Sequence, residues 1–540
     1  MSGNHVHVSP PVPELPEAVD IYDTTLRDGS QQEGLSLTVD DKLRVAEQLD
    51  HLGVQFIEGG WPGANPKDEE FFRRAAAGEL HLHTATLVAF GSTRKAGGEA
   101  SSDPVLRHLL DAQTPAVCLV AKAAERHVTE TLRTSLTEAI DMVADSVAYL
   151  VGQGRRVFLD AEHFFDGYRV NPGFSLDILR AAQGAGAEVL VLCDTNGGCL
   201  PFEAERIVGQ VRDAVDVALG CHFHNDSGCG VANSLVAVRQ GVTQVQGCIN
   251  GYGERTGNAD LCSAVPDLTL KMGVRTIERE RLERLTPVAH HIAELVNIAP
   301  DPHQPYVGGS AFAHKAGLHT SAIARARDAY EHVPPDTVGN GSRFVVSEMS
   351  GRSTVQLKAS ELGLDLDGPV LADVLDNLKT LEHRGYHFEV ADGSLELLMR
   401  AATGWKQTFF RLESFRVITE QREDGAFVTE ATIKVHAGDE RVLATAEGNG
   451  PVNALDAALR KAIGSKFPEL AHLHLTDYKV RVLDTAKGTG AVTRVLIDTT
   501  DGERSWSTIG VSENIIEASW EALADSIVFG LLHRVDGGAG

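Results

Sequence analysis

Basic residues and long apolar runs are both scarce in this sequence. Lys and Arg number 49 against 75 Asp and Glu, which gives a formal net charge of −26. Nucleic acids and anionic membranes bind to basic surfaces, so neither is an expected partner. No run approaches the ~18 consecutive apolar residues of a membrane-spanning helix. A small anionic substrate is still compatible, because a bound cation can reverse the local field.

Cysteine is infrequent, and no two cysteines form a CxxC pair. The chain has seven, an odd number, all in one region: Cys118, Cys193, Cys199, Cys221, Cys229, Cys248 and Cys262. We expect these to be reduced, buried thiols in a cytoplasmic protein. Residues 1–18 are rich in Pro and His but lack a basic stretch followed by an apolar one. We therefore expect a flexible lead-in and no signal peptide.

Eight short apolar runs, each followed by an amphipathic stretch, occupy the first half of the chain. The runs cover residues 19–26, 56–60, 83–90, 116–121, 156–161, 189–193, 218–223 and 244–250. Such runs are typical of parallel strands buried on both faces. In the first amphipathic stretch, Thr38 and Asp41 favour a helix start and Gly53 favours its end. The pattern predicts an α/β fold, a (β/α)8 barrel over residues 19–285, and the lack of GxGxxG argues against a dinucleotide-binding sheet.

The remainder of the chain has two further patterns. Residues 286–404 are mostly helical in pattern, and we expect helical linker subdomains there. From residue 405 to the end, three strand-like runs and a helix occur twice, with the helices at Pro451–Ile463 and Ser512–Leu531. This duplication predicts an α+β domain of two βββα units over residues 405–540, paired around a ligand cleft. A dimerisation domain without a ligand is the alternative.

Polar and ionisable residues follow the apolar runs, where a barrel gathers them at one mouth. His222 and His224 are at positions i and i+2 of the seventh run, so both imidazoles point to the same side. Asp28, after the first run, can add a carboxylate, and Asn258 can add an amide oxygen. This set leaves open positions on a six-coordinate divalent cation, which a bidentate 2-oxo acid can fill. A histidine pair satisfied by hydrogen bonds is the alternative.

Three further residues at this mouth have both a functional and a structural interpretation. Arg27 can stabilise developing oxyanion charge, or it can form a surface ion pair with Asp28. Thr195 can bind a carboxylate or cap a helix. Glu162 can orient a substrate, or it can be a structural acid.

These motifs together resemble the DRE-TIM metallolyases, and within them the Claisen-condensing group of 2-isopropylmalate, homocitrate and citramalate synthases. The resemblance lies in residues 23–31, 222–226, 253–259, 311–319 and 347–353. The C-terminal duplication is similar to the amino-acid-binding regulatory domain of that group. The resemblance implies an acyltransferase that uses acetyl-CoA and a divalent metal, which is Mg²⁺, Mn²⁺ or Zn²⁺.

The resemblance also implies roles for individual residues. The implied metal ligands are Asp28, His222 and His224, and Asn258 is implied to lie close to the same metal. The implied substrate-contacting residues are Arg27, Glu162 and Thr195. His319 and Tyr330 match residues that a neighbouring subunit contributes to the mouth, which implies a homodimer with linker residues in the active site. We expect His319, assisted by Tyr330, to take a proton from the acetyl-CoA methyl group; a structural histidine in a Gly-rich hinge is the alternative.

Within that group, residues 57–68, 90–94 and 161–167 resemble the citramalate synthase branch. This likeness implies pyruvate as the acceptor, a place in isoleucine biosynthesis and isoleucine as the feedback ligand. A pocket for the pyruvate methyl group should be narrow, and four apolar residues are placed to form it: Val88, Phe90, Leu119 and Val120. Ordinary barrel core is the alternative for these four. Asp160 replaces a tyrosine that some members of the branch carry, which leaves the pocket geometry open.

Four other functions remain open. The nearest is the same chemistry with 2-oxoisovalerate, as in a 2-isopropylmalate synthase. The others are a lyase that cleaves a hydroxyacyl-CoA, an iron oxygenase with a two-histidine-one-carboxylate site, and a non-catalytic metal and amino-acid sensor. The regulatory pair favours a biosynthetic step over a degradative lyase. The presence of Arg27, Glu162 and His319 argues against a sensor.

Overall fold

The computed structural model describes residues 14–314, 326, 330–344, 352–483, 488 and 490–535. The chain forms two compact units, Met1–Phe312 with Glu331–Gly341, and Ala313–Tyr330 with Ser342–Gly540. Among the described residues, no helix combines the length and the apolar character needed to cross a membrane.

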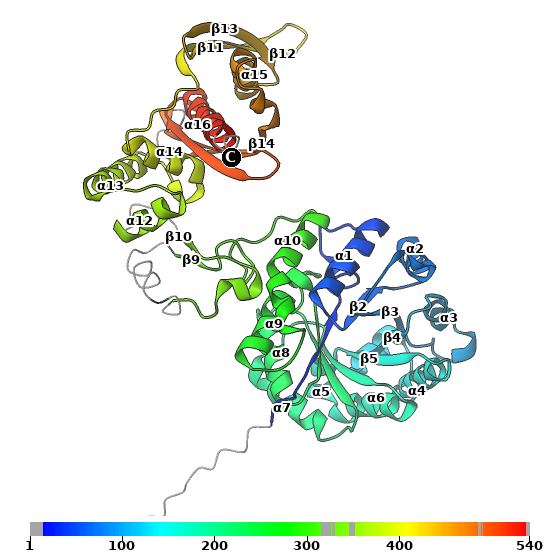
Figure 1. The fold of residues 1–540 in the computed structure, drawn as a ribbon. Coiled ribbons are helices and arrows are strands. Elements are labelled where there is room, and N and C mark those ends of the chain that lie inside the picture. The colour runs from blue at the N-terminus through cyan, green and yellow to red at the C-terminus, as the bar shows by residue number, and fades with distance from the viewer. Residues whose placement is uncertain are drawn as a thin grey trace, which may run out of the picture. The chain divides into compact units, whose positions relative to one another are not determined.

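The first unit contains a closed barrel of eight strands in sequence order, with β1 paired to β8 (Figure 1). The strands are β1 (Asp20–Asp23), β2 (Phe56–Gly60), β3 (Thr86–Ser92), β4 (Ala116–Lys122), β5 (Arg156–Glu162), β6 (Val189–Asp194), β7 (Ala218–Phe223) and β8 (Gln244–Gly247). Each strand overlaps one of the apolar runs, so the predicted (β/α)8 barrel is confirmed.

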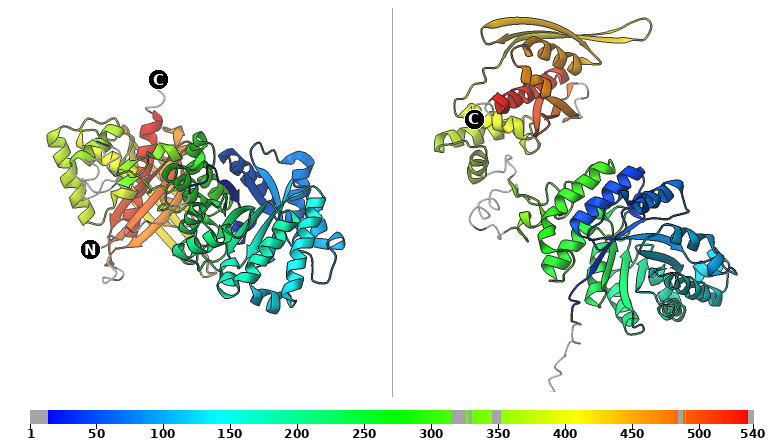
Figure 2. Two further views of the ribbon diagram at one scale, coloured as in Figure 1. Left: turned by 90° about the horizontal axis from the view of Figure 1, so that it is seen from below. Right: turned by 45° about the vertical axis from the view of Figure 1, so that its right-hand side comes forward.

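Helices surround the ring of strands on the outside (Figures 1 and 2). They are α1 (Val39–Leu52), α2 (Pro66–Arg74), α3 (Pro104–Asp111), α4 (Leu136–Gly152), α5 (Phe164–Val170), α6 (Pro172–Ala185), α7 (Pro201–Arg212), α8 (Gly230–Arg239), α9 (Leu261–Pro266) and α10 (Leu285–Leu295). At the start of α1 the Thr38 hydroxyl accepts from Asp41 N–H at 3.1 Å, and the Asp41 carboxylate accepts from Thr38 N–H at 2.9 Å. Gly53 ends the helix with φ 98°, a conformation that glycine adopts without strain.

Two apolar layers stabilise the barrel. One lies between the strands and the helices and includes Leu119. The other fills the interior, where the rings of Tyr22, Phe56 and Phe158 meet at centroid distances of 5.1 to 6.0 Å. We call these three residues the aromatic floor. Phe158 comes two residues before Asp160 on the same side of β5, so the floor lies deeper than the polar residues at the strand ends.

The second unit begins with a linker region of α12 (Arg352–Glu361), α13 (Gly368–His383) and α14 (Asp392–Ala402). A short parallel pair, β9 (Ala313–His314) and β10 (Arg343–Phe344), also belongs to it. Two antiparallel sheets follow, each ending in a helix: β11 (Arg411–Gln421), β12 (Phe427–Ala437), β13 (Glu440–Gly448) and α15 (Pro451–Ile463), then β14 (His474–Val482), β15 (Thr493–Thr500), β16 (Ser505–Ser512) and α16 (Ile515–Val535). The predicted duplication of a βββα unit is therefore confirmed.

A polar seam joins α14 to β16 and α16 within the second unit. Ser394 Oγ donates to Asp525 Oδ2 at 2.7 Å and accepts from Ile509 N–H at 3.1 Å. Burial raises the pKa of Asp525 to about 7; the Ser394 hydroxyl opposes this rise and the neighbouring Glu521 adds to it. The second unit thus contains a carboxyl group that loses its proton near neutral pH.

An Asp525→Asn variant is expected to be more stable than the parent chain at pH 8, with a smaller gain in stability at pH 5. The folded pKa of Asp525 lies above its ordinary value of about 4, so the group favours folding at low pH and this contribution is lost as the pH rises from about 4 to 7. Asparagine stays neutral and avoids that loss, which is on the order of a few kcal/mol.

Thermal unfolding followed by tryptophan fluorescence measures this effect. Of the four tryptophans, Trp405, Trp506 and Trp520 lie in the second unit and Trp61 lies in the first. The signal therefore comes mainly from the unit that contains Asp525. Parallel pH profiles for the variant and the parent chain would contradict the assignment.

Candidate active site

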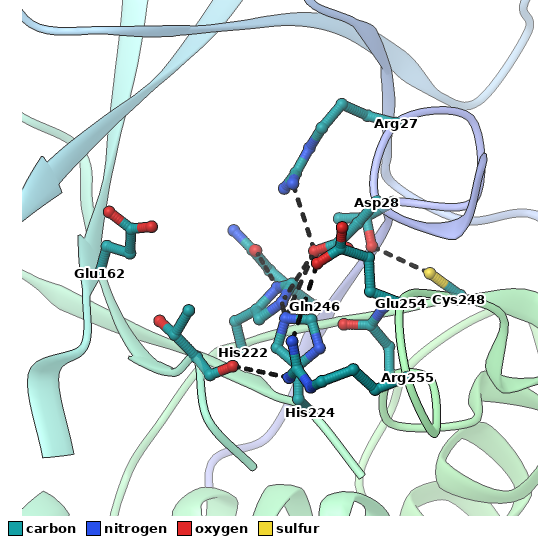
Figure 3. Close-up of polar contacts among 12 residues, drawn as sticks. Arg27, Asp28, Glu162, His222, His224, Gln246, Cys248, Glu254 and Arg255 are labelled. Atoms are coloured by element: carbon teal, nitrogen blue, oxygen red, sulfur yellow. Dashed lines mark hydrogen bonds and ion pairs between the residues drawn. The ribbon is translucent and has the colours of Figure 1, made fainter. Parts of the chain in front are cut away.

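Three side chains converge on one point at the mouth of the barrel (Figure 3). Asp28 follows β1, His222 lies on β7, and His224 follows directly after β7. The Nε2 atoms of His222 and His224 lie 3.2 and 3.6 Å from Asp28 Oδ2 and 3.4 Å from each other. All three side chains are buried. Two imidazoles and one carboxylate are therefore close enough to share an ion.

Protonation differs among the three groups. Burial lowers the pKa of His222, but the hydrogen bond to the Asp28 carboxylate outweighs burial and raises this pKa above its usual value. Burial favours the protonated form of Asp28, but Arg27 and the two histidines outweigh it and hold the pKa of this carboxyl well below its usual range. Burial, with His222 beside it, lowers the pKa of His224 to about 4. The His224 imidazole is therefore neutral at pH 7, and neutral imidazoles and carboxylates are the forms that ligate metals.

A fourth oxygen lies next to His224 along the backbone. Asn258 pairs with His224 through a backbone bridge, and its Nδ2 donates to the Tyr252 carbonyl at 3.0 Å. Its Oδ1 is buried and has no hydrogen-bond partner within the described part of the chain. A buried carbonyl without a partner is costly, so this oxygen points to a missing ligand. One carboxylate, two imidazoles and one amide oxygen fit a divalent cation.

Arg27 is held on three sides beside Asp28. Its Nε donates to Glu58 Oε1 at 2.5 Å, and its Nη1 lies 3.2 Å from Asp28 Oδ2. The guanidinium carbon lies 4.0 Å from the centroid of the Phe90 ring. Tyr22 Oη donates to the other Glu58 oxygen at 2.6 Å. Arg27 is therefore a fixed cation, and Glu58 is a residue that the sequence analysis missed, although an acid within the apolar β2 run was an available signal.

A cavity of about 630 Å³ opens over these residues. Eight of the predicted site residues line it: Arg27, Asp28, Phe90, Val120, Glu162, Thr195, His222 and His224. Five of the lining side chains are cationic: Arg27, Arg94, Lys95, Lys122 and Arg255. Four acidic side chains share the lining, Asp28, Asp160, Glu162 and Glu254, so an anionic ligand would bind through individual cationic groups and not through a net positive field.

Glu162 and Thr195 reach the cavity from β5 and from the turn after β6. Glu162 forms an ion pair with Lys122 of β4. The Thr195 hydroxyl oxygen accepts from His163 N–H at 2.9 Å, so the hydroxyl proton remains available to a ligand. Arg255 fixes the same turn by donating to the Thr195 carbonyl at 2.8 Å. No role for Lys122 or Arg255 was predicted from the sequence, although Arg255 lies within one of the family motifs.

Two of the four residues predicted for the acceptor pocket do not line the cavity. Leu119 is buried in the layer between strands and helices, because its neighbours Cys118 and Val120 occupy the inner side of β4. Val88 is fully buried in the barrel interior. The pocket prediction therefore fails for Val88 and Leu119, and it stays a prediction for Phe90 and Val120.

The structure does not test the roles predicted for the base and its assistant. His319 lies outside the described residues. Tyr330 is described, is 44% exposed and belongs to the second unit. The roles of both residues stay predictions from the sequence.

Family models match the chain in three places. A model described as HMGL-like covers residues 18–286, and a homocitrate synthase post-HMGL domain-like model covers residues 306–386. A LeuA allosteric (dimerisation) domain model covers residues 389–530. The barrel, the linker and the duplicated unit thus each match a model from related enzymes.

Relatives that match over nearly their full length show which branch of these enzymes the chain belongs to. The chain is 53% identical to the (R)-citramalate synthase of Streptomyces coelicolor, over 96% of this chain and 98% of the relative. It is 51% identical to the (R)-citramalate synthase of Synechocystis sp., over 95% of this chain and 96% of the relative. Identity to the 2-isopropylmalate synthase of Methanocaldococcus jannaschii is 30%, over 95% of each chain. By these matches, the chain belongs to the (R)-citramalate synthase family.

Proposed function

We propose that this chain catalyses the Claisen-type condensation of acetyl-CoA with pyruvate to give (R)-citramalate and CoA. The observation that carries the proposal is the meeting of Asp28, His222 and His224 beside a fixed Arg27 in one cavity of a member of this family. A 2-oxo acid is a small anion with two adjacent oxygens, so it suits both the metal-ligand cluster and the cationic groups in the lining.

Asp28, His222, His224 and Asn258 would hold the divalent cation. Mg²⁺ and Mn²⁺ suit the oxygen donors, and Zn²⁺ suits the imidazoles. When bound, the cation supplies Lewis-acid polarisation of the oxo group of the substrate.

The other residues act on the substrates directly. Arg27 offers its guanidinium to the oxo oxygen, where negative charge develops as the new carbon–carbon bond forms. Thr195 donates a hydrogen bond from its hydroxyl group to the substrate carboxylate. Glu162 orients the reacting groups. His319, assisted by Tyr330, takes the proton from the acetyl methyl group, and the resulting carbanion attacks the oxo carbon. The oxo oxygen gains a proton, and water then cleaves the thioester and releases CoA.

The experiment that tests this function measures CoA release with a thiol reagent across a panel of 2-oxo acids. Pyruvate should give the highest kcat/KM, with 2-oxobutyrate lower and 2-oxoisovalerate much lower. The acid product should be identified as (R)-citramalate by chiral chromatography. Preferred turnover of 2-oxoisovalerate would instead support a 2-isopropylmalate synthase.

A Val120→Ala variant is expected to favour larger acceptors. Val120 lines the cavity, so removing two methyl groups should raise the ratio of kcat/KM for 2-oxobutyrate over pyruvate about 10-fold. The matched control is Leu119→Val, the neighbouring position on β4 that faces the helices. It should leave the ratio unchanged. An equal shift in both variants would show that general loosening of the barrel controls selectivity.

We further propose a domain layout of residues 1–18 as the lead-in, 19–285 as the catalytic barrel, 286–404 as the linker and 405–540 as the regulatory domain. The match of residues 389–530 to an allosteric (dimerisation) model supports a homodimer with a regulatory ligand. Isoleucine is that ligand if citramalate leads to isoleucine. Free thiols at all seven cysteines are consistent with a cytoplasmic enzyme.

Isoleucine is expected to bind the full-length protein and to lower its turnover. A small amino acid at a regulatory site acts by binding one conformation better than another, so inhibition and binding should share one concentration range. Calorimetric titration with isoleucine gives the affinity, and CoA release gives the inhibition. Leucine and valine are the matched comparisons. Absence of binding together with uninhibited turnover would exclude isoleucine as the ligand.

A further inference from the structure

One buried side chain connects the predicted metal ligand on β7 to the centre of the barrel. Gln246 lies on β8 directly beside His222 in the strand register. Its Oε1 lies 2.9 Å from His222 Nδ1, and its Nε2 donates to Asp160 Oδ1 at 3.0 Å. Gln246 and His222 are seen together in Figure 3. All three side chains are buried, so water does not replace these contacts.

The chemistry of an amide gives this connection a direction. Glutamine has a donor end and an acceptor end, whereas an ionised carboxylate only accepts hydrogen bonds. In the structure, Asp160 Oδ1 accepts from the Nε2 end of Gln246, and the Oε1 end faces His222. An oxygen acceptor at that place requires a proton on His222 Nδ1. His222 Nε2, which faces Asp28 and His224, is then the nitrogen whose lone pair is available to a cation.

We propose that Gln246 is a positioning residue that fixes His222 in the Nδ1–H form, and that Asp160 fixes the orientation of Gln246. The inference rests on the proposed metal site, because it concerns which nitrogen of His222 the cation meets. Partners of this kind orient metal-bound histidines in many proteins, and their loss costs about 10–100-fold in metal affinity.

Mn²⁺ binding to the full-length protein without substrates tests the proposal. Electron paramagnetic resonance of free Mn²⁺ gives the dissociation constant directly. Gln246→Leu removes the acceptor and should weaken Mn²⁺ binding by about 10–100-fold. The matched control is Gln244→Leu, on the same strand and the same side of it. Gln244 is also buried, but its side chain has no hydrogen-bond partner among the described residues, so its loss should leave Mn²⁺ affinity unchanged.

A charge-conserving exchange separates positioning from a general packing effect. Asp160→Asn combined with Gln246→Glu moves the carboxylate from β5 to β8. The asparagine amide then donates to the glutamate, and the glutamate still accepts from His222 Nδ1–H. We expect this double variant to recover most of the affinity that Gln246→Leu loses. A double variant as weak as Gln246→Leu, or a Gln246→Leu variant within about twofold of the parent chain, would overturn the proposal.

Nuclear magnetic resonance of ¹⁵N-labelled histidine in the metal-free protein gives a second readout. At alkaline pH, where the His222 ring is neutral, its proton should lie on Nδ1 in the parent chain and in the exchange variant, and this preference should be lost in Gln246→Leu. An Nε2–H form of neutral His222 in the parent chain would overturn the proposal. Neither readout depends on turnover, so a failure of the condensation reaction itself is distinguishable.

Discussion

Replacing Arg27 by alanine is expected to lower kcat for the condensation by about 10²–10³-fold while the divalent cation stays bound. Arg27 is the cation that Glu58 and Phe90 fix beside Asp28, and the charge it meets exists only as the oxo oxygen becomes an alkoxide. Its removal should therefore act on kcat more than on the affinity for pyruvate. Thiol-release kinetics measure the first effect, and Mn²⁺ titration checks that the metal site survives.

The alanine variant leaves two buried carboxylates without their cation, so controls for folding are needed. Arg27→Ala with Glu58→Gln removes one of these charges and should fold as well as the parent chain, with the same loss of turnover. Arg27→Lys keeps a charge but not the two-armed contact to Glu58 and Asp28, so its kcat should fall between those of the parent chain and Arg27→Ala. An Arg27→Ala variant that keeps more than about one tenth of the parent kcat would refute the role.

Removing the divalent cation with a chelator is expected to reduce turnover by at least about 10²–10³-fold, because Lewis-acid polarisation contributes several kcal/mol. Added Mn²⁺ should restore the parent enzyme. His224→Ala should lower turnover as strongly and should not recover with Mn²⁺, since this imidazole is one of the three proposed ligands whose polar atoms lie close together. Thiol-release assays before and after dialysis measure both effects.

The matched histidine control is His127→Ala. His127 stacks on His163 at a centroid distance of 3.8 Å and is not among the converging groups. The variant should lose activity to the chelator and regain it with Mn²⁺ in the same way as the parent chain. Full turnover of the chelated parent enzyme would exclude a metal-dependent condensation.

The sequence was sufficient to predict the barrel and the position of its mouth, because each strand is a compact apolar run with polar residues after it. The spacing of His222 and His224 also predicted their common orientation, since the period of two is a property of any strand. In the second unit, the helix predicted at Pro451–Ile463 has the same bounds in the structure. Proline at its start and glycines before it provided strong local signals.

Other parts of the site depend on contacts that local patterns do not encode. Leu119 and Val120 are both apolar, and a strand buried on both faces has no polar side to tell inward from outward. The pairing of Arg27 with Glu58 joins the segment after β1 to the adjacent strand β2, and its geometry depends on the pairing of these strands. The link from Gln246 to His222 depends in the same way on strand register. A residue that a neighbouring subunit contributes, as predicted for His319, cannot be placed at the site from the fold of one chain.

The aromatic floor has a kinetic consequence. Tyr22, Phe56 and Phe158 fill the barrel interior, so small molecules cannot pass through it and must use one entrance for arrival and departure. If the 2-oxo acid binds at the inner end against the proposed metal ligands, the bulky thioester would close the passage behind it. Binding and release are then expected to be ordered. Pyruvate enters before acetyl-CoA, and CoA leaves before the newly formed dicarboxylate.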